Sequence, residues 1–287
     1  MSKTKNNGAD EPSATNAKQS DLADLVLAPG GPRPRSRLHR VPPHHVIRYR
    51  MGTVHIVDLS TGDDVARIDP PDRNIAGPLG NGWIVFAKYV NDTGSPITAF
   101  TTRWTVPEPP RTNSGQTIYL FNAMLDAGER TIVQPVLQWG VSDIGGGPFW
   151  TIANWHVTPT GDVLHSDPVP VRPHDTLIGS ISLVGSNGNG NIYLSEFAGE
   201  PSTRMTFDGL EELTKCTETL ETRNITACSD YPASASTAFT GINIRTGAST
   251  PSVSWAAIDQ VTDCGQSARI LANSGSNGAV TLQYPTA

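Results

Sequence analysis

The stretch Pro135-Val136-Leu137-Gln138-Trp139-Gly140 places one uncharged amide in an apolar run that stops at a glycine. Successive side chains of a β-strand point to opposite faces, so Val136 and Gln138 share one face and Leu137 and Trp139 share the other. A buried glutamine costs stability unless its amide finds hydrogen-bond partners. Gln138 is therefore either a satisfied core amide or a group directed at a ligand.

Short runs of this kind, separated by turn signals, fill most of the chain. Among 287 residues there are 27 Gly and 23 Pro, and only 17% are charged, which favours short strands and turns over long helices. The pattern predicts an all-β fold, an antiparallel double-sheet β-sandwich of jelly-roll type. One short helix is expected at 207–213. Strands are expected at 53–58, 65–68, 83–87, 97–106, 117–121, 132–139, 150–157, 169–171, 176–184, 192–197, 204–207, 213–222, 238–244, 253–258 and 279–284.

Three parts of the chain differ in composition. Residues 1–42 are polar and basic and predict a disordered tail. Residues 43–79 are expected to form an N-terminal β-hairpin extension, because two alternating runs flank a turn. Residues 80–287 are expected to form the sandwich.

The bulk properties bear on partners and location. The net charge is −6, and no apolar run reaches the roughly 18 residues of a membrane helix, so neither a nucleic acid nor a membrane is an expected partner. The polar start shows no secretory signal, which makes an intracellular location the default expectation, and a monomer is expected. Cys216 and Cys228 are the best candidates for a disulfide, with three reduced thiols as the alternative.

The run 213–222 continues into a second glutamate on the opposite face. Glu218 shares its face with a cysteine and a leucine, which indicates that it points inward, whereas Glu221 lies on the other face. Burial raises the pKa of a carboxyl group, and a raised pKa suits a general acid or base. The alternative is an ion pair between Glu218 and an arginine such as Arg103 or Arg204.

Two further patterns concern ligands. The histidines lack the spacing of a metal site, so neither a metal nor another cofactor is expected. The aromatic residues of 149–156 are either sandwich core or the floor of a groove for an extended peptide or a sugar.

Taken in order, six segments between about Gly80 and Tyr284 resemble the glutamic peptidases, or eqolisins. They are 100–109 (FTTRWTVPEP), 136–140 (VLQWG), 150–159 (WTIANWHVTP), 171–177 (VRPHDTL), 217–221 (TETLE) and 239–242 (FTGI). The resemblance implies a concanavalin-like sandwich, and an acid-acting endopeptidase that uses no cofactor and belongs to a typically secreted family. It implies Gln138 and Glu218 as the catalytic dyad. The substrate-binding residues that it implies are Trp104, Phe121, Trp150, Asn154 and Trp155, although the family has a glutamate where Asn154 stands.

By this resemblance, Glu218 activates a water molecule while the amide of Gln138 donates to the substrate carbonyl and then to the oxyanion. The two side chains should then contact one shared water, with a polypeptide as substrate. One alternative is a non-catalytic module that binds a glycan or peptide in the same groove. Another is a carbohydrate lyase or hydrolase, for which Glu196 and Glu218 are the candidate carboxylate pair.

Overall fold

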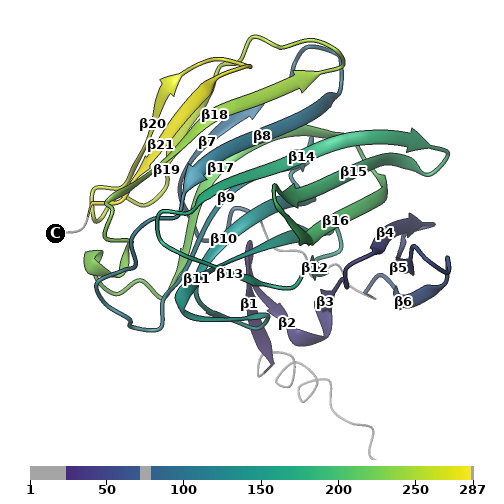
Figure 1. Ribbon diagram of the computed structural model, residues 1–287, viewed down its shortest axis with the longest axis horizontal. Helices are drawn as coiled ribbons and strands as arrows, with labels where there is room; N and C mark the ends of the chain where they lie inside the picture. Colours follow the sequence, from purple (N-terminus) through teal and green to yellow (C-terminus); the bar gives the residue numbers. More distant parts are fainter. Residues whose placement is uncertain (1–23, 72–78, 286–287) are drawn as a thin grey trace, which may run out of the picture.

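The computed structural model describes residues 24–71 and 79–285. They form two large β-sheets, one separate two-stranded hairpin and two short 3-10 helices (Figure 1). The prediction of an all-β sandwich is confirmed. The described part of the chain contains no α-helix, so the helix expected at 207–213 is wrong: strand β16 continues to Leu210 and β17 begins at Leu213.

The nine-stranded sheet has the order β19-β7-β17-β9-β10-β11-β12-β3, with β13 paired to β11. Apart from the parallel pair β12–β3, its neighbouring strands are antiparallel. Its strands are β3 (Leu38–Arg40), β7 (Trp83–Val90), β9 (Thr117–Asp126), β10 (Ile132–Ser142), β11 (Gly145–Val157), β12 (Val163–His165), β13 (Val169–Val171), β17 (Leu213–Arg223) and β19 (Ala256–Asp259).

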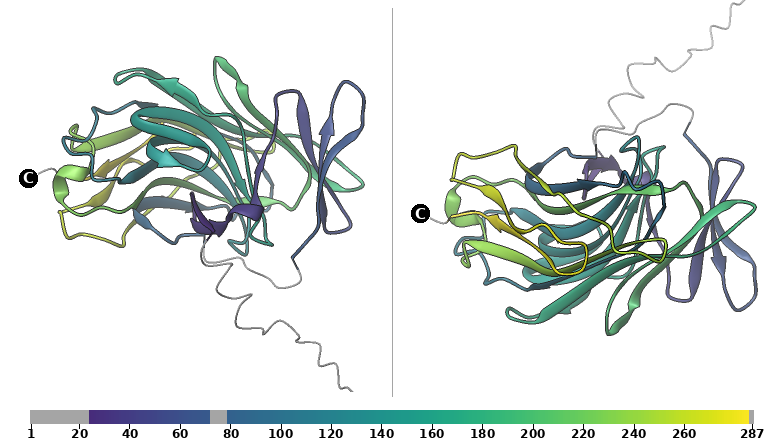
Figure 2. Two further views of the ribbon diagram at one scale, coloured as in Figure 1. Left: turned by 90° about the horizontal axis from the view of Figure 1, so that it is seen from below. Right: turned by 90° about the horizontal axis from the view of Figure 1, so that it is seen from above.

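The ten-stranded sheet has the order β20-β21-β18-β8-β14-β15-β16-β4-β5-β6. Its strands are β4 (His45–Arg50), β5 (Thr53–Asp58), β6 (Asp64–Ile68), β8 (Ile97–Thr105), β14 (Thr176–Asn187), β15 (Gly190–Phe197), β16 (Glu200–Leu210), β18 (Ser236–Thr246), β20 (Ser267–Ala272) and β21 (Gly278–Gln283). The remaining elements are β1 (Leu25–Ala28), β2 (Gly31–Pro34), η1 (Arg35–Arg37) and η2 (Cys228–Asp230). Strands β4–β6 lie at the end of the molecule away from the C-terminus (Figure 2).

Two apolar clusters flank the nine-stranded sheet. The larger one fills the space between the two sheets, and the smaller one lies on the outer face of the nine-stranded sheet. All ten residues of β9 are buried, because this central strand is covered on both faces. Such a strand reads as a nearly continuous apolar run rather than a strict alternation.

The N-terminal region differs from its prediction. Residues 1–23 lie outside the described part, but β1, β2 and β3 all fall within the segment expected to be a disordered tail. Val26 is only 1% exposed and Ala28 is fully buried in the outer-face cluster. Two small apolar side chains in a polar segment are a weak signal of order in the sequence. They can nevertheless hold the hairpin in place, because the outer face of the sheet provides an apolar surface against which they are buried.

The cysteine prediction is also wrong. Cys228 forms a disulfide with Cys264, and Cys216 is a buried free thiol. The physical reason is that Cys216 points into the core between the sheets, whereas Cys228 lies in the loop after β17. Burial and the nearby Glu218 raise the pKa of the Cys216 thiol well above its usual value.

Two features are absent from the described residues. No helix there is long and apolar enough to cross a membrane. No group of three or more His, Cys, Asp or Glu side chains in these ranges is arranged to hold a metal ion.

Candidate functional site

Strand register brings three polar side chains into one row. Tyr119 on β9 lies directly opposite Gln138 on β10 and, on its other side, opposite Glu221 on β17. Side chains that face each other across neighbouring strands project from the same face of a sheet. This face is the outer one, since Tyr119 belongs to the outer-face cluster. We call Glu221, Tyr119 and Gln138 the polar row.

Glu218 lies on the other face of the same sheet. Its cross-strand partner is Asn122, three residues along β9 from Tyr119, so alternation turns it toward the ten-stranded sheet. There the hydroxyl of Thr102 donates to Glu218 Oε1 at 2.6 Å. The prediction that Gln138 and Glu218 contact one shared water is therefore wrong, because the sheet itself separates them.

The expected substrate-binding residues divide between the two faces. Phe121 and Trp155 lie on the outer face with Gln138. Trp104 and Trp150 belong to the core between the sheets. Asn154 also points into that core, where its amide donates to the carbonyl of Thr203 on the opposite sheet at 2.8 Å. The aromatic run 149–156 thus serves both faces in alternation.

Glu218 is fully buried, and its Oε2 has no hydrogen-bond partner among the described residues. Burial raises its pKa well above the usual value, and the hydrogen bond from Thr102 acts in the opposite direction. The alternative, an ion pair of Glu218 with Arg103 or Arg204, is also wrong: Arg204 pairs with Glu196 at 2.7 Å, and Glu218 is bonded by Thr102. Glu196 follows Ser195, which contacts the inter-sheet core, so Glu196 points to the far side of the ten-stranded sheet. The two carboxylates do not face each other.

Gln138 is a satisfied amide. Its Nε2 donates to the carbonyl of Gly140 at 3.0 Å and to that of Gly145 at 3.2 Å. Its Oε1 accepts from the hydroxyl of Ser142 at 3.1 Å. Both hydrogens of the amide are therefore engaged by backbone carbonyls of the hairpin between β10 and β11.

Gly140 makes this closed hairpin possible. The register shifts between Trp139 and Gly140, and Gly140 has φ +89°. A Cβ atom at this position would lie 2.2 Å from the carbonyl oxygen of Gln116. Only glycine combines that backbone conformation with that close approach, so the glycine ending the apolar run shapes the surroundings of Gln138.

Glu221 is the ionisable member of the polar row. It is fully buried, and the backbone N–H of Gly30 donates to Oε1 at 2.9 Å and to Oε2 at 3.1 Å. Arg223 lies 3.2 Å from Oε1. Burial raises the pKa of Glu221 to about 8, while Arg223 and the bond from Gly30 act to lower it. The sequence pointed to Glu221 only through alternation, which places its side chain on the face of β17 opposite to that of Glu218.

The hairpin β1–β2, Leu25–Pro34, lies against the Glu221 end of the row, and we call it the strap. The guanidinium of Arg33 is buried at 4% exposure and donates to the carbonyl of Gly30 at 3.2 Å. At the other end, the N–H of Leu27 donates to Asp143 at 3.0 Å, and Arg35 pairs with the same carboxylate at 2.8 Å. A segment of backbone thus lies across the outer face and is held by polar contacts.

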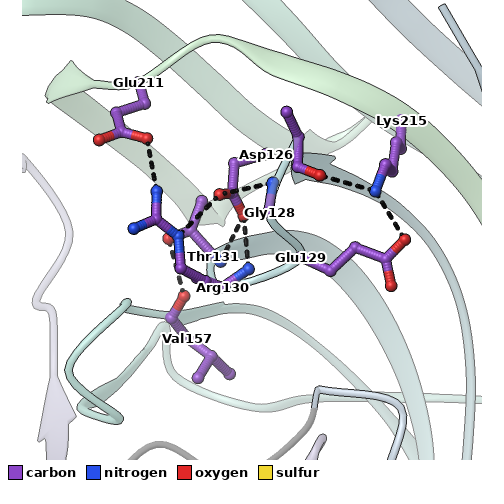
Figure 3. Close-up of polar contacts among 9 residues, drawn as sticks. Asp126, Gly128, Glu129, Arg130, Thr131, Val157, Glu211 and Lys215 are labelled. Atoms are coloured by element: carbon purple, nitrogen blue, oxygen red, sulfur yellow. Dashed lines mark hydrogen bonds and ion pairs between the residues drawn. The ribbon is translucent and has the colours of Figure 1, made fainter. Parts of the chain in front are cut away.

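A capped turn joins β9 to β10 (Figure 3). The Asp126 carboxylate, at the end of β9, accepts from the backbone N–H groups of Gly128, Arg130 and Thr131 at 3.2, 2.6 and 2.7 Å. All of these contacts lie within the turn between β9 and β10, so Asp126 has a structural role.

Solved structures with a similar fold are glutamic peptidases. One is scytalido-glutamic peptidase with a transition state analog inhibitor, 12% identical, with 71% of this chain and 98% of that chain covered and a TM-score of 0.49. Another is SCP-B, a member of the eqolisin family, in a complex with the tripeptide Ala-Ile-His, at the same identity and coverage and a TM-score of 0.44. No family model and no curated protein matches the chain.

Proposed function

We propose that the outer face of the nine-stranded sheet binds an extended polypeptide and hydrolyses it under acid conditions once the strap is displaced. One observation carries this proposal. The strap is itself a stretch of polypeptide lying on that face, and its backbone N–H at Gly30 donates to the buried carboxyl group of Glu221. A substrate main chain offers the same kind of backbone N–H donor.

Unpaired polar atoms on the same face support a polypeptide ligand. Among the residues that the structure describes, Gln134 has no partner for either end of its amide, and the hydroxyls of Thr217 and Thr219 have none. All three are buried. A cavity of about 80 Å³ lies at the Thr217 end of the face. Main-chain N–H and C=O groups supply both the donors and the acceptors that such a surface lacks.

In the proposed reaction Glu221 takes the role that the family resemblance implies for Glu218. As a carboxylate it accepts a proton from water, and it later returns that proton to the leaving nitrogen. Burial is the largest cause of its raised pKa, and Arg223 acts to lower it. Displacing the strap hydrates Glu221 and leaves Arg223 in place on β17, so its pKa falls and the carboxylate becomes available at acid pH.

A non-catalytic polypeptide-binding module is the second candidate. The hydrogen bonds of Gln138 favour this candidate. Both amide hydrogens that could bind an oxyanion are already donated to the backbone carbonyls of Gly140 and Gly145. In this alternative the outer face binds a peptide segment in place of the strap and releases it unchanged.

The test compares the full-length protein with its Gly30→Pro variant. Proline has no N–H to donate to Glu221 and cannot adopt the φ of +84° found at Gly30, so the substitution should release the strap. Gly94→Pro is the matched control, since Gly94 also has a positive φ but lies in a loop away from the face. Denatured casein is incubated with each protein from pH 2 to 7, and new N-termini are counted.

We expect cleavage below about pH 5, the range in which a carboxyl base of ordinary pKa is partly ionised, and a faster rate for Gly30→Pro than for wild type and Gly94→Pro. Intact casein throughout, together with retention of peptides by Gly30→Pro in a pull-down, would decide for the binding module.

A further inference from the structure

We infer that the hydroxyl group of Tyr119, rather than the amide of Gln138, is the donor that holds the oxyanion in the reaction proposed above. The inference rests on that proposed function and names a catalytic residue that the segments resembling the peptidase family do not include. It comes from a count of free donors in the polar row.

The position of Tyr119 favours it over Gln138. Neighbouring strands lie about 4.8 Å apart, so Gln138 and Glu221 are separated by two spacings, roughly 10 Å between their backbones. Tyr119 stands between them, directly opposite Glu221. A carbonyl carbon attacked by a water molecule on Glu221 must lie within about 3–3.5 Å of that water. Tyr119 is therefore one strand nearer than Gln138 to Glu221, where the oxyanion would develop.

The hydrogen bonds of the polar row also favour Tyr119. Tyr119 is fully buried, and its hydroxyl has no partner among the described residues. A buried polar atom without a partner is costly, so this hydroxyl is a candidate for bonding to a ligand. The amide of Gln138 in contrast has both hydrogens engaged. The hydroxyl of Tyr119 is thus free to donate a hydrogen bond to a ligand, whereas the amide of Gln138 is not.

The protonation state fits a donor. Burial, and to a lesser extent the nearby carboxyl group of Glu221, raises the pKa of Tyr119 far above its ordinary value. Tyr119 therefore keeps its proton across the whole working pH range and can donate it in a hydrogen bond. Asp143 and Arg223 are the other charged groups that act on Tyr119, and they act in opposite directions.

The proposed step balances as a hydrolysis. Glu221 takes one proton from water as the water oxygen bonds to the carbonyl carbon, and the carbonyl π bond breaks to give an oxyanion. Tyr119 donates a hydrogen bond to that oxyanion without losing its proton. The C–N bond then breaks as the oxyanion collapses, and Glu221 passes its proton to the leaving nitrogen. Water is the only co-reactant.

The test substitution is Tyr119→Phe, made in the full-length protein and in its Gly30→Pro variant. The change removes one oxygen that has no partner in the folded state, so the melting temperature should not fall. Tyr89→Phe is the matched control, because the Tyr89 hydroxyl is also buried and without a partner but lies in the core between the sheets. Steady-state cleavage of a fluorogenic peptide separates kcat from KM.

We expect Tyr119→Phe to lower kcat by about 10²–10³-fold with little change in KM, as for the loss of one oxyanion donor, and Tyr89→Phe to match its parent. A kcat for Tyr119→Phe within about threefold of its parent would overturn the inference alone. Absence of cleavage by both parent proteins would overturn the proposed function and this inference with it, and the inactive parents would identify that outcome.

Discussion

The backbone N–H of Gly30 donates to both carboxylate oxygens of Glu221, at 2.9 and 3.1 Å, across 191 positions of sequence. This relationship closes the outer face of the nine-stranded sheet. It places main chain from the strap against a buried carboxyl group, which is also what a bound substrate would do. Four predictions concern this carboxyl group and the framework that holds it.

Glu221 should make the fold less stable as pH rises. Its pKa is raised from 4.5 to about 8 in the folded state, so the folded protein binds this proton more tightly than the unfolded chain does. Stability from this group is fully present below about pH 4.5 and is lost as pH rises toward 8. Urea unfolding at pH 4, 6 and 8 measures the slope, and Glu221→Gln should flatten it. The exposed Glu211→Gln serves as control, and an unchanged slope in Glu221→Gln would contradict the prediction.

Glu218 should be dispensable for catalysis. Glu218→Gln keeps an acceptor for the hydroxyl of Thr102 and removes a group that is costly to ionise in the core. We expect this variant to retain peptide cleavage and to be at least as stable as wild type at pH 7. Glu221→Gln should instead lose about 10²–10⁴-fold of kcat, the usual contribution of a general base. The opposite ranking of the two variants would restore Glu218 as the catalytic carboxyl group.

The capped turn of Figure 3 should be sensitive to one residue. Asp126→Ala removes an acceptor shared by three backbone N–H groups, and we expect a loss of about 2–3 kcal/mol in the free energy of unfolding. Glu211→Ala tests the neighbouring ion pair, in which Glu211 is largely exposed and contacts Arg130 at 3.1 Å. That variant should change stability by less than about 0.5 kcal/mol. Equal losses in the two variants would show that the turn is not held by Asp126.

The cysteines should differ in reactivity. Reduction of the Cys228–Cys264 disulfide is expected to lower the free energy of unfolding by about 2–4 kcal/mol. Cys216 is buried and its pKa is raised, so it should not react with a thiol reagent in the folded, unreduced protein. One thiol should titrate after denaturation without reductant, and three after reduction. A thiol that reacts rapidly in the native protein would contradict the assignment.

Alternation along single strands was readable from the sequence. The opposite orientations of Glu218 and Glu221 on one strand follow from the period of two, and the bounds of β5 and β13 agree with the expected ranges. The sandwich architecture followed from the same signal repeated along the chain. These features depend on residues that are close together in the sequence, so the pattern of neighbouring residues is enough to predict them.

Cross-strand register was not readable in this way. Whether Gln138 shares a face with Glu218 or with Glu221 depends on how β10 and β17 each pair with β9, and long-range pairing has no local signature. The same limit applies to the disulfide partner of Cys228. The strap was missed because its two buried apolar residues find their partners only after the sheet exists.

The order of synthesis gives the long separation between Gly30 and Glu221 another meaning. A ribosome delivers the strap 191 positions before the carboxyl group that Gly30 contacts, so this bond cannot form until β17 has emerged. The contacts of the strap with Asp143 can form earlier, because Asp143 precedes β17 in the chain. Closure of the outer face at Glu221 therefore has to wait for a late part of the chain.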